Sequence, residues 1–204
     1  WYLTTFPGGG EYDKPGFSVA TGSAHWDTSY HSQGSTELTH NRWYHLVGTF
    51  KAGETTKVYL DGVIEGVASI SLPSDLSLDT EAKMMFAAYE NNGSPNSQAG
   101  IRMNNVAIFD KELSATEINT LYNTGISKDL SNEDNLVGYW NFNEGSGSYL
   151  ADLSTNNNTG SIKNSPTWIS GSTDAPDSGS FGMHIGDGTK DFYIYMRNLR
   201  KTYK

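Results

Sequence analysis

The sequence contains no cysteine, so disulfide bonds, thiol catalysis and cysteine-based zinc sites are excluded. It also has no apolar run that approaches the roughly 18 residues of a membrane-spanning helix. Positive charge is scarce, because 14 Lys and Arg stand against 23 Asp and Glu, and the net charge is −9. We therefore expect no nucleic-acid partner and no membrane insertion, since nucleic acid and anionic membranes attract a cationic surface.

Turn-forming residues are abundant where charge is sparse. Only 18% of the 204 residues are charged, whereas 22 are glycine. Hydrophobic residues make up 36% and aromatic residues 12%, which is enough for a core. This composition favours short strands joined by turns, in one all-β domain or one and a half small ones. A chain that starts at Trp1 without a signal peptide is expected to be a processed product or an excised fragment.

Strand signals dominate the middle of the chain. Residues 43–50 are rich in aromatic and β-branched side chains. A second apolar run, 57–60, leads into Asp61-Gly62, a pair typical of a type I′ hairpin turn because both central positions need a positive φ. The returning strand begins at Val63. Further strands are predicted at residues 83–89, 100–109, 136–142 and 192–196.

One short helix is predicted after residue 113. Ser114 and Glu117 have the spacing of a capping box, in which each side chain bonds the other's free backbone N–H. Ile118, Leu121 and Tyr122 then fall on one helical face. A glycine at position 125 suits the C-terminal cap, so the helix is expected to span residues 114–124.

The order of these motifs resembles the laminin-G-like family in its bacterial and phage form. The resemblance is carried by R-W-Y-H-L-V-G-T-F at 42–50, K-V-Y-L-D-G at 57–62 and I-R-M-N-N-V-A-I-F-D-K-E-L-S at 101–114. A second stretch, L-V-G-Y-W-N-F-N-E-G-S-G at 136–147, is similar to the opening of another such domain. The resemblance implies an antiparallel β-sandwich of the jelly-roll, concanavalin-A-like kind with one short surface helix.

The resemblance also implies a division of the chain. Residues 1–130 correspond to a laminin-G-like sandwich that lacks its usual N-terminal strands, and residues 131–204 to the start of a second unit. Unpaired central strands would expose backbone groups and a sheet edge. We therefore expect residues 136–200 to supply the missing strands of one sandwich. Two units, the second incomplete, are the alternative.

No catalytic signature is found in the sequence. Paired carboxylates at the spacing that glycoside hydrolysis uses on one strand are absent. A Gly-x-Ser-x-Gly elbow and a His-Glu-x-x-His helix are absent too. His25, His31 and His40 allow a metal or sugar site in principle, although polar ends of strands explain them more simply. We expect that the chain is not an enzyme.

Calcium is the cofactor that the family resemblance implies. It points to Asp152 with Asn156 and Asn158, because calcium takes carboxylate and amide oxygens from loops. Turn chemistry explains the same residues equally well, since Asp and Asn bond their own backbone and tolerate a positive φ. Both readings stay open at this point.

A sugar site needs an exposed aromatic ring flanked by polar side chains. Trp26, Tyr30, Tyr89 and Tyr149 border polar loops and are the candidates. Trp43 and Trp140 alternate with apolar residues and are predicted to be core.

The predicted function is a non-catalytic carbohydrate-binding or adhesion module of a surface, secreted or virion protein. Its partner is a glycan or polysaccharide, with other protein subunits of such an assembly as a second kind of partner. Two alternatives are a structural or decorative protein-interaction domain of a phage or surface assembly, and an accessory module of a polysaccharide-degrading enzyme. The expected location is extracellular, on a cell surface or in a virion.

Overall fold

The computed structural model describes residues 1–7, 13–19, 30–39, 42–76, 84–86, 89–91, 94–96, 101–125, 128–163, 165–170, 181–185 and 194–196. These residues form antiparallel strands and one short helix, which confirms the predicted all-β class. The chain divides into two compact units, one of residues 1–80 with 111–125 and one of residues 81–110 with 126–204. In the described part of the chain, no helix has the length and apolarity to cross a membrane.

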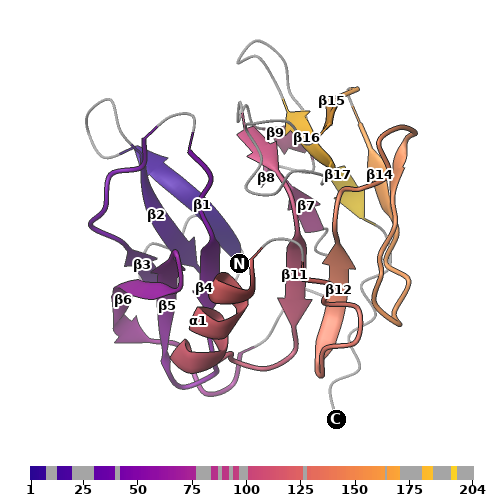
Figure 1. The fold of residues 1–204 in the computed structure, drawn as a ribbon. Coiled ribbons are helices and arrows are strands. Elements are labelled where there is room, and N and C mark those ends of the chain that lie inside the picture. The colour runs from indigo at the N-terminus through magenta and orange to yellow at the C-terminus, as the bar shows by residue number, and fades with distance from the viewer. Residues whose placement is uncertain are drawn as a thin grey trace. The chain divides into compact units, whose positions relative to one another are not determined.

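The first unit contains two three-stranded antiparallel sheets and the helix (Figure 1). One sheet has the order β1-β2-β3, with β1 at Tyr2–Pro7, β2 at Asp13–Ser18 and β3 at His31–Gln33. The other has the order β4-β5-β6, with β4 at Leu46–Thr49, β5 at Thr55–Leu60 and β6 at Val63–Ser71.

The two sheets of the first unit pack face to face around a small apolar core. Phe17 of β2 and Val19, just after β2, pack with Val58 of β5, and Leu72, just after β6, completes the cluster. Gly48 of β4 makes this approach feasible, because a Cβ atom there would lie 2.2 Å from the Phe17 ring. A larger residue at position 48 would therefore push the sheets apart.

Local signals in the sequence located the hairpin and the helix correctly. Asp61 and Gly62 have φ values of 49° and 81° and join β5 to β6 as predicted. Helix α1 spans Ala115–Thr124, with Ser114 as N-cap and both halves of the capping box formed with Glu117. Gly125, at φ 77°, ends the helix.

The second unit is built from shorter strands, and its elements are as follows. Strands β7 (Met84–Phe86), β13 (Tyr149–Leu150), β14 (Gly160–Ile162) and β17 (Ile194–Met196) form a sheet of order β13-β14-β17-β7. Strands β10 (Ile101–Met103), β15 (Thr167–Ser170) and β16 (Phe181–Ile185) form a sheet of order β10-β16-β15. The pairs are β11 (Val106–Phe109) with β12 (Leu136–Trp140) and β8 (Tyr89–Asn91) with β9 (Ser94–Asn96).

The predicted strand at 100–109 is in fact two strands, β10 and β11. Asn105, between them, has a φ of 47°, a left-handed conformation that interrupts the extended backbone. Strands β10 and β11 pair with β16 and β12, and β7 pairs with β17. Strands from 84–109 are thus bonded to strands from 136–196, and the boundary predicted after residue 130 falls inside the second unit. The assignment of residues 131–204 to a second family repeat stays a prediction.

The core of the second unit is aromatic. Trp140, Phe142 and Leu150 are fully buried and pack with Phe86. The rings of Phe86 and Trp140 meet edge to face, with centroids 5.4 Å apart. Trp140 is therefore a core residue, as its alternation with apolar neighbours predicted, whereas Trp43 in the first unit is only half-buried.

Candidate functional site

Tyr149 is the most exposed of the described aromatic side chains, at 63%. It lies in β13, the edge strand of the four-stranded sheet of the second unit. Its neighbour Leu150 points the other way and is fully buried in the core. Because successive side chains in a strand point to opposite faces of the sheet, this alternation holds the Tyr149 ring on the outer face.

Polar side chains surround Tyr149 on that face. Ser161 of β14 lies directly opposite Tyr149 in the strand register. Thr159 and Lys163 flank β14, two residues to either side of Ser161, and are exposed; if the register continues past the ends of β14, they take positions diagonal to Tyr149, about 7–8 Å away. We call the following set the Tyr149 face: Tyr149, Ala151, Thr159, Ser161 and Lys163.

Glu144 covers the open edge of β13 beside this face. Its Oε1 accepts a hydrogen bond of 2.8 Å from the backbone N–H of Ala151. Its Oε2 is buried and has no hydrogen-bond partner among the described residues. An edge strand otherwise presents unpaired N–H groups. The Glu144 carboxylate satisfies one of these backbone groups and is not directed to the outer face.

Asp152 is the hydrogen-bonding centre of the loop that follows β13. Its Oδ1 accepts from the backbone N–H groups of Tyr139 and Ser154, both at 2.9 Å. Its Oδ2 accepts from the N–H of Asn158 at 2.7 Å and from the Ser154 hydroxyl at 2.9 Å. The residue is only 7% exposed. One buried carboxylate thus closes the loop on itself through three donors and fastens it to β12 through the fourth, the N–H of Tyr139.

The two asparagines predicted beside Asp152 continue this fastening. The side-chain amides of Asn156 and Asn158 both donate to the Val137 carbonyl, at 3.0 and 2.9 Å. The Asn158 carbonyl accepts from Nε1 of Trp140 at 3.1 Å. Oδ1 of Asn158 is buried without a hydrogen-bond partner among the described residues.

The donor set of this loop does not fit a calcium ion. A carboxylate has about four lone-pair sites, and N–H and O–H donors fill four at Asp152. In the described part of the chain, no group of three His, Cys, Asp or Glu side chains is placed to hold a metal ion. The contacts favour the turn chemistry weighed against calcium, and calcium binding itself stays a prediction.

The other predicted sugar-stacking residues are placed differently. Tyr30 is half-buried and packs against the Phe17 and Val58 core, so a border with a polar loop did not mean an exposed ring. Tyr89 lies in β8, where its side chain is not described, and Trp26 lies outside the described residues. Tyr149 is therefore the one candidate whose exposed ring the described residues establish.

Histidine 31, from the predicted histidine group, pairs with a serine. Nδ1 of His31 lies 2.7 Å from the Ser18 hydroxyl, directly across the β2–β3 register. Burial lowers the pKa of His31. Ser18 is itself fully buried, so no substrate can reach this hydroxyl and the pair joins two strands. His25 and His40 lie outside the described residues.

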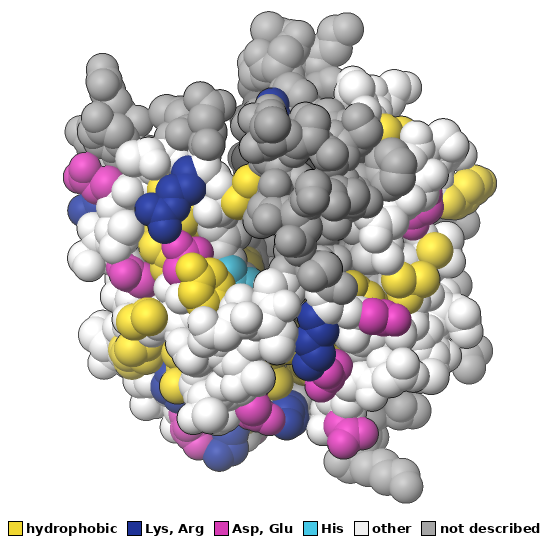
Figure 2. Space-filling view, viewed as in Figure 1, with side chains coloured by type: hydrophobic (Ala, Val, Ile, Leu, Met, Phe, Trp, Pro, Cys, Tyr) yellow, Lys and Arg dark blue, Asp and Glu magenta, His cyan; other side chains and the backbone are white. Residues whose placement is uncertain are grey.

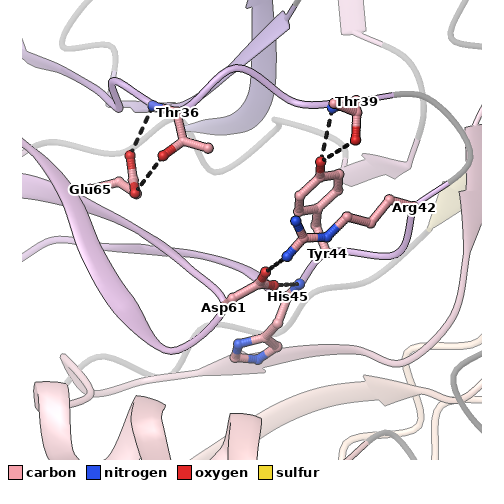
Figure 3. A network of polar contacts seen from close by, with 7 residues as sticks. All are labelled: Thr36, Thr39, Arg42, Tyr44, His45, Asp61 and Glu65. Atoms are coloured by element: carbon pink, nitrogen blue, oxygen red, sulfur yellow. Dashed lines mark hydrogen bonds and ion pairs between the residues drawn. The ribbon is translucent and has the colours of Figure 1, made fainter.

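A polar network in the first unit fastens the β5–β6 turn (Figure 3). Asp61 accepts from Nη2 of Arg42 at 2.8 Å and from the backbone N–H of His45 at 2.9 Å. The Arg42 guanidinium also lies 4.7 Å from the centre of the Tyr44 ring. The role of Asp61 is thus in the turn that the sequence predicted, where its carboxylate holds the segment 42–45 that leads into β4.

The histidine in this network has an unpaired ring nitrogen. Nδ1 of His45 is buried and makes no hydrogen bond to the described residues. Burial lowers the pKa of His45, and the nearby Asp61 charge opposes that shift. The ring packs against Tyr122 of α1, with centroids 5.8 Å apart. The ring thus packs between the β5–β6 turn network and α1.

Sequence reasoning missed the polar partners of Tyr149. Thr159, Ser161 and Lys163 alternate with residues 160 and 162, which is the period-two pattern of a strand with one exposed face. That pattern was available in the sequence. The pairing that sets Ser161 opposite Tyr149 was not, because it depends on the nine-residue connection 151–159, whose path is set by the hydrogen bonds of the loop.

Comparison with known proteins gives one match. A family model described as the concanavalin A-like lectin/glucanases superfamily matches residues 1–119. No curated protein and no solved structure is matched by the chain.

Proposed function

The chain belongs to the concanavalin A-like lectin/glucanases superfamily, and from that premise we propose that it is a non-catalytic module that binds carbohydrate. Membership is compatible with carbohydrate binding or adhesion, but members of one fold host different functions. The surface must therefore carry the argument. The expected setting, a surface, secreted or virion protein, stays part of the proposal.

The single observation behind this proposal is the Tyr149 face. An exposed aromatic ring offers a flat apolar surface to the C–H face of a sugar, and nearby hydroxyl and ammonium groups bond its oxygens. Tyr149 provides the ring, and Thr159, Ser161 and Lys163 provide the polar groups. Leu150 beneath it is fixed in the core, so the ring is carried on a packed strand.

The carboxylates near this face support a binding role over a catalytic one. Glu144 has one oxygen on a backbone N–H and the other buried. Asp152 is buried with four hydrogen-bond donors. Acid–base catalysis needs a carboxyl group that can reach the proton of a bound substrate, and neither group is placed on the outer face.

A glycan microarray with the purified chain tests the proposal, followed by titration calorimetry on the glycans it selects. Tyr149→Ala should lower the affinity about tenfold, the scale of an aromatic contact residue. Tyr149→Phe is the matched control, because it keeps the ring, and should retain most of the affinity. A folded wild-type chain that binds no glycan would overturn the proposal, and so would binding that survives in Tyr149→Ala.

A second function, protein–protein interaction, is favoured by β6 of the first unit. Four of its apolar side chains are between 46% and 60% exposed, namely Val63, Ile64, Val67 and Ile70. Ile64 and Val67 lie opposite Tyr59 and Lys57 in the strand register and so share one face of β6, and exposed apolar residues that lie together mark interaction surfaces in soluble proteins. Among the described residues on the face drawn in Figure 2, Lys and Arg side chains lie beside Asp and Glu side chains, as on a mixed-charge surface. Self-association in sedimentation velocity that Val67→Lys abolishes would support this function.

A further inference from the structure

We propose that the glycan bound at the Tyr149 face is acidic, with Tyr149 against a sugar ring and Lys163 paired with its carboxylate or sulfate. The inference rests on the proposed function and adds the chemical class of the ligand. It commits to a polysaccharide chain lying across β13 and β14, because the face is an open strand surface that presents side chains from both strands.

The positive charge of the Tyr149 face favours an acidic ligand. Of the five residues that define the Tyr149 face, Lys163 alone is charged, and it is exposed. Among the described residues no ion pair to Lys163 is formed, whereas four other lysines, Lys51, Lys57, Lys111 and Lys128, each pair with a glutamate. Its exposed ammonium, unpaired within the described residues, is the cation that we assign to an anionic ligand.

The carboxylate of Glu144, at the edge of β13, lies toward the end of the sheet opposite Lys163. Glu144 binds the N–H of Ala151, which is two residues after Tyr149. In the antiparallel register Lys163 falls on the side of residue 147, before Tyr149. A sugar stacked on the Tyr149 ring would thus have its cation at the residue-147 end, away from the Glu144 carboxylate, which is bonded to the backbone. Its acidic group should point toward Lys163.

The net charge of −9 does not exclude such a ligand. Charges more than about 8 Å away are largely screened at physiological ionic strength. The electrostatic part of the affinity at the Tyr149 face therefore comes mainly from Lys163, which lies within that distance. The negative charge on the rest of the surface mainly lowers the association rate. Binding to an acidic chain should therefore weaken as salt rises.

Affinity electrophoresis in gels that contain either alginate, a polyuronate, or dextran, a neutral glucan, tests the inference. The wild-type chain should be retarded more by alginate, and more strongly at 50 mM than at 500 mM NaCl. Lys163→Gln should weaken the alginate affinity about threefold to fivefold, as expected for an exposed ion pair, and leave any dextran affinity unchanged. Lys51→Gln, which removes an exposed lysine from the first unit, is the matched control and should change neither.

The outcomes separate the inference from the function on which it rests. Equal retardation by both gels, or alginate binding that Lys163→Gln leaves unchanged, overturns the acidic ligand while the carbohydrate module stands. A folded chain that neither gel retards, and that no glycan on the array binds, overturns both. Retardation by alginate that Tyr149→Ala does not reduce would place the anion elsewhere on the chain and also refutes the inference.

Discussion

Two aspartates, one in each unit, hold a turn against a neighbouring strand, and they differ in their surroundings. Asp61 accepts one backbone N–H and one guanidinium, and its Arg42 partner is 60% exposed at the side chain. Asp152 accepts three backbone N–H groups and one hydroxyl inside the second unit. The same residue type thus makes a surface contact in one unit and a buried anchor in the other. Replacing each aspartate by asparagine, and measuring the resulting loss of unfolding free energy in its unit, tests this difference.

The largest effect is expected for Asp152→Asn. Asparagine keeps one acceptor oxygen, but its NH2 group must face donors that the second carboxylate oxygen now accepts. At least one buried N–H, of Tyr139, Ser154 or Asn158, is then left without an acceptor. We expect a loss of about 3 kcal/mol in the unfolding free energy of the second unit.

Native-state hydrogen exchange read by mass spectrometry measures this loss within each unit. Protection should fall in peptides from residues 136–163 and stay at the wild-type level in peptides from 42–76, which serve as the internal reference. A Tyr149→Phe variant controls for an exposed change in the same region. Unchanged protection at 136–163 would mean that the four contacts to Asp152 do not anchor the loop.

The elements that sequence reasoning located are those whose determinants are local. The Asp61-Gly62 turn and the capping box of α1 depend on residues within four positions of one another. The anchoring role of Asp152 depends on Tyr139, thirteen residues earlier, whose N–H becomes a donor only once β12 lies beside the loop. An Asp-x-Ser sequence before asparagines is therefore compatible with a metal loop and with a turn.

The burial of aromatic residues also depends on long-range contacts that the sequence does not show. Tyr30 and Tyr149 both border polar segments in the sequence, yet one packs on a core and the other is exposed. Strand alternation predicts which face a residue occupies, but not which face of the sheet is covered. The pairing of strands from 84–109 with strands from 136–196 likewise spans too long a separation for local patterns to indicate.

Asp61→Asn should have a much smaller effect. Asparagine tolerates the positive φ at this position and keeps an oxygen for the His45 N–H, so mainly the ion pair with Arg42 is lost. Exposed ion pairs contribute about 0–1 kcal/mol. Protection in peptides from residues 42–76 should therefore fall by less than about 1 kcal/mol. The difference from wild type should shrink further in 1 M NaCl, and a loss as large as that of Asp152→Asn would show that exposure does not explain the contrast.

The smallest effect on hydrogen-exchange protection is expected from added calcium. This experiment tests most directly whether Asp152 is a buried anchor, in contrast to Asp61. A ligand that binds only the folded state at one hundred times its dissociation constant stabilises that state by about 2.7 kcal/mol. Because four donors already occupy the Asp152 carboxylate, 1 mM CaCl2 and 1 mM EDTA should give the same protection at 136–163. Magnesium at the same concentration controls for ionic strength. A calcium-specific gain in wild type that Asp152→Asn abolishes would mean that the carboxylate releases its donors to hold a cation. Asp152 would then be a ligand with a metal-free resting arrangement, and burial alone could no longer account for its difference from Asp61.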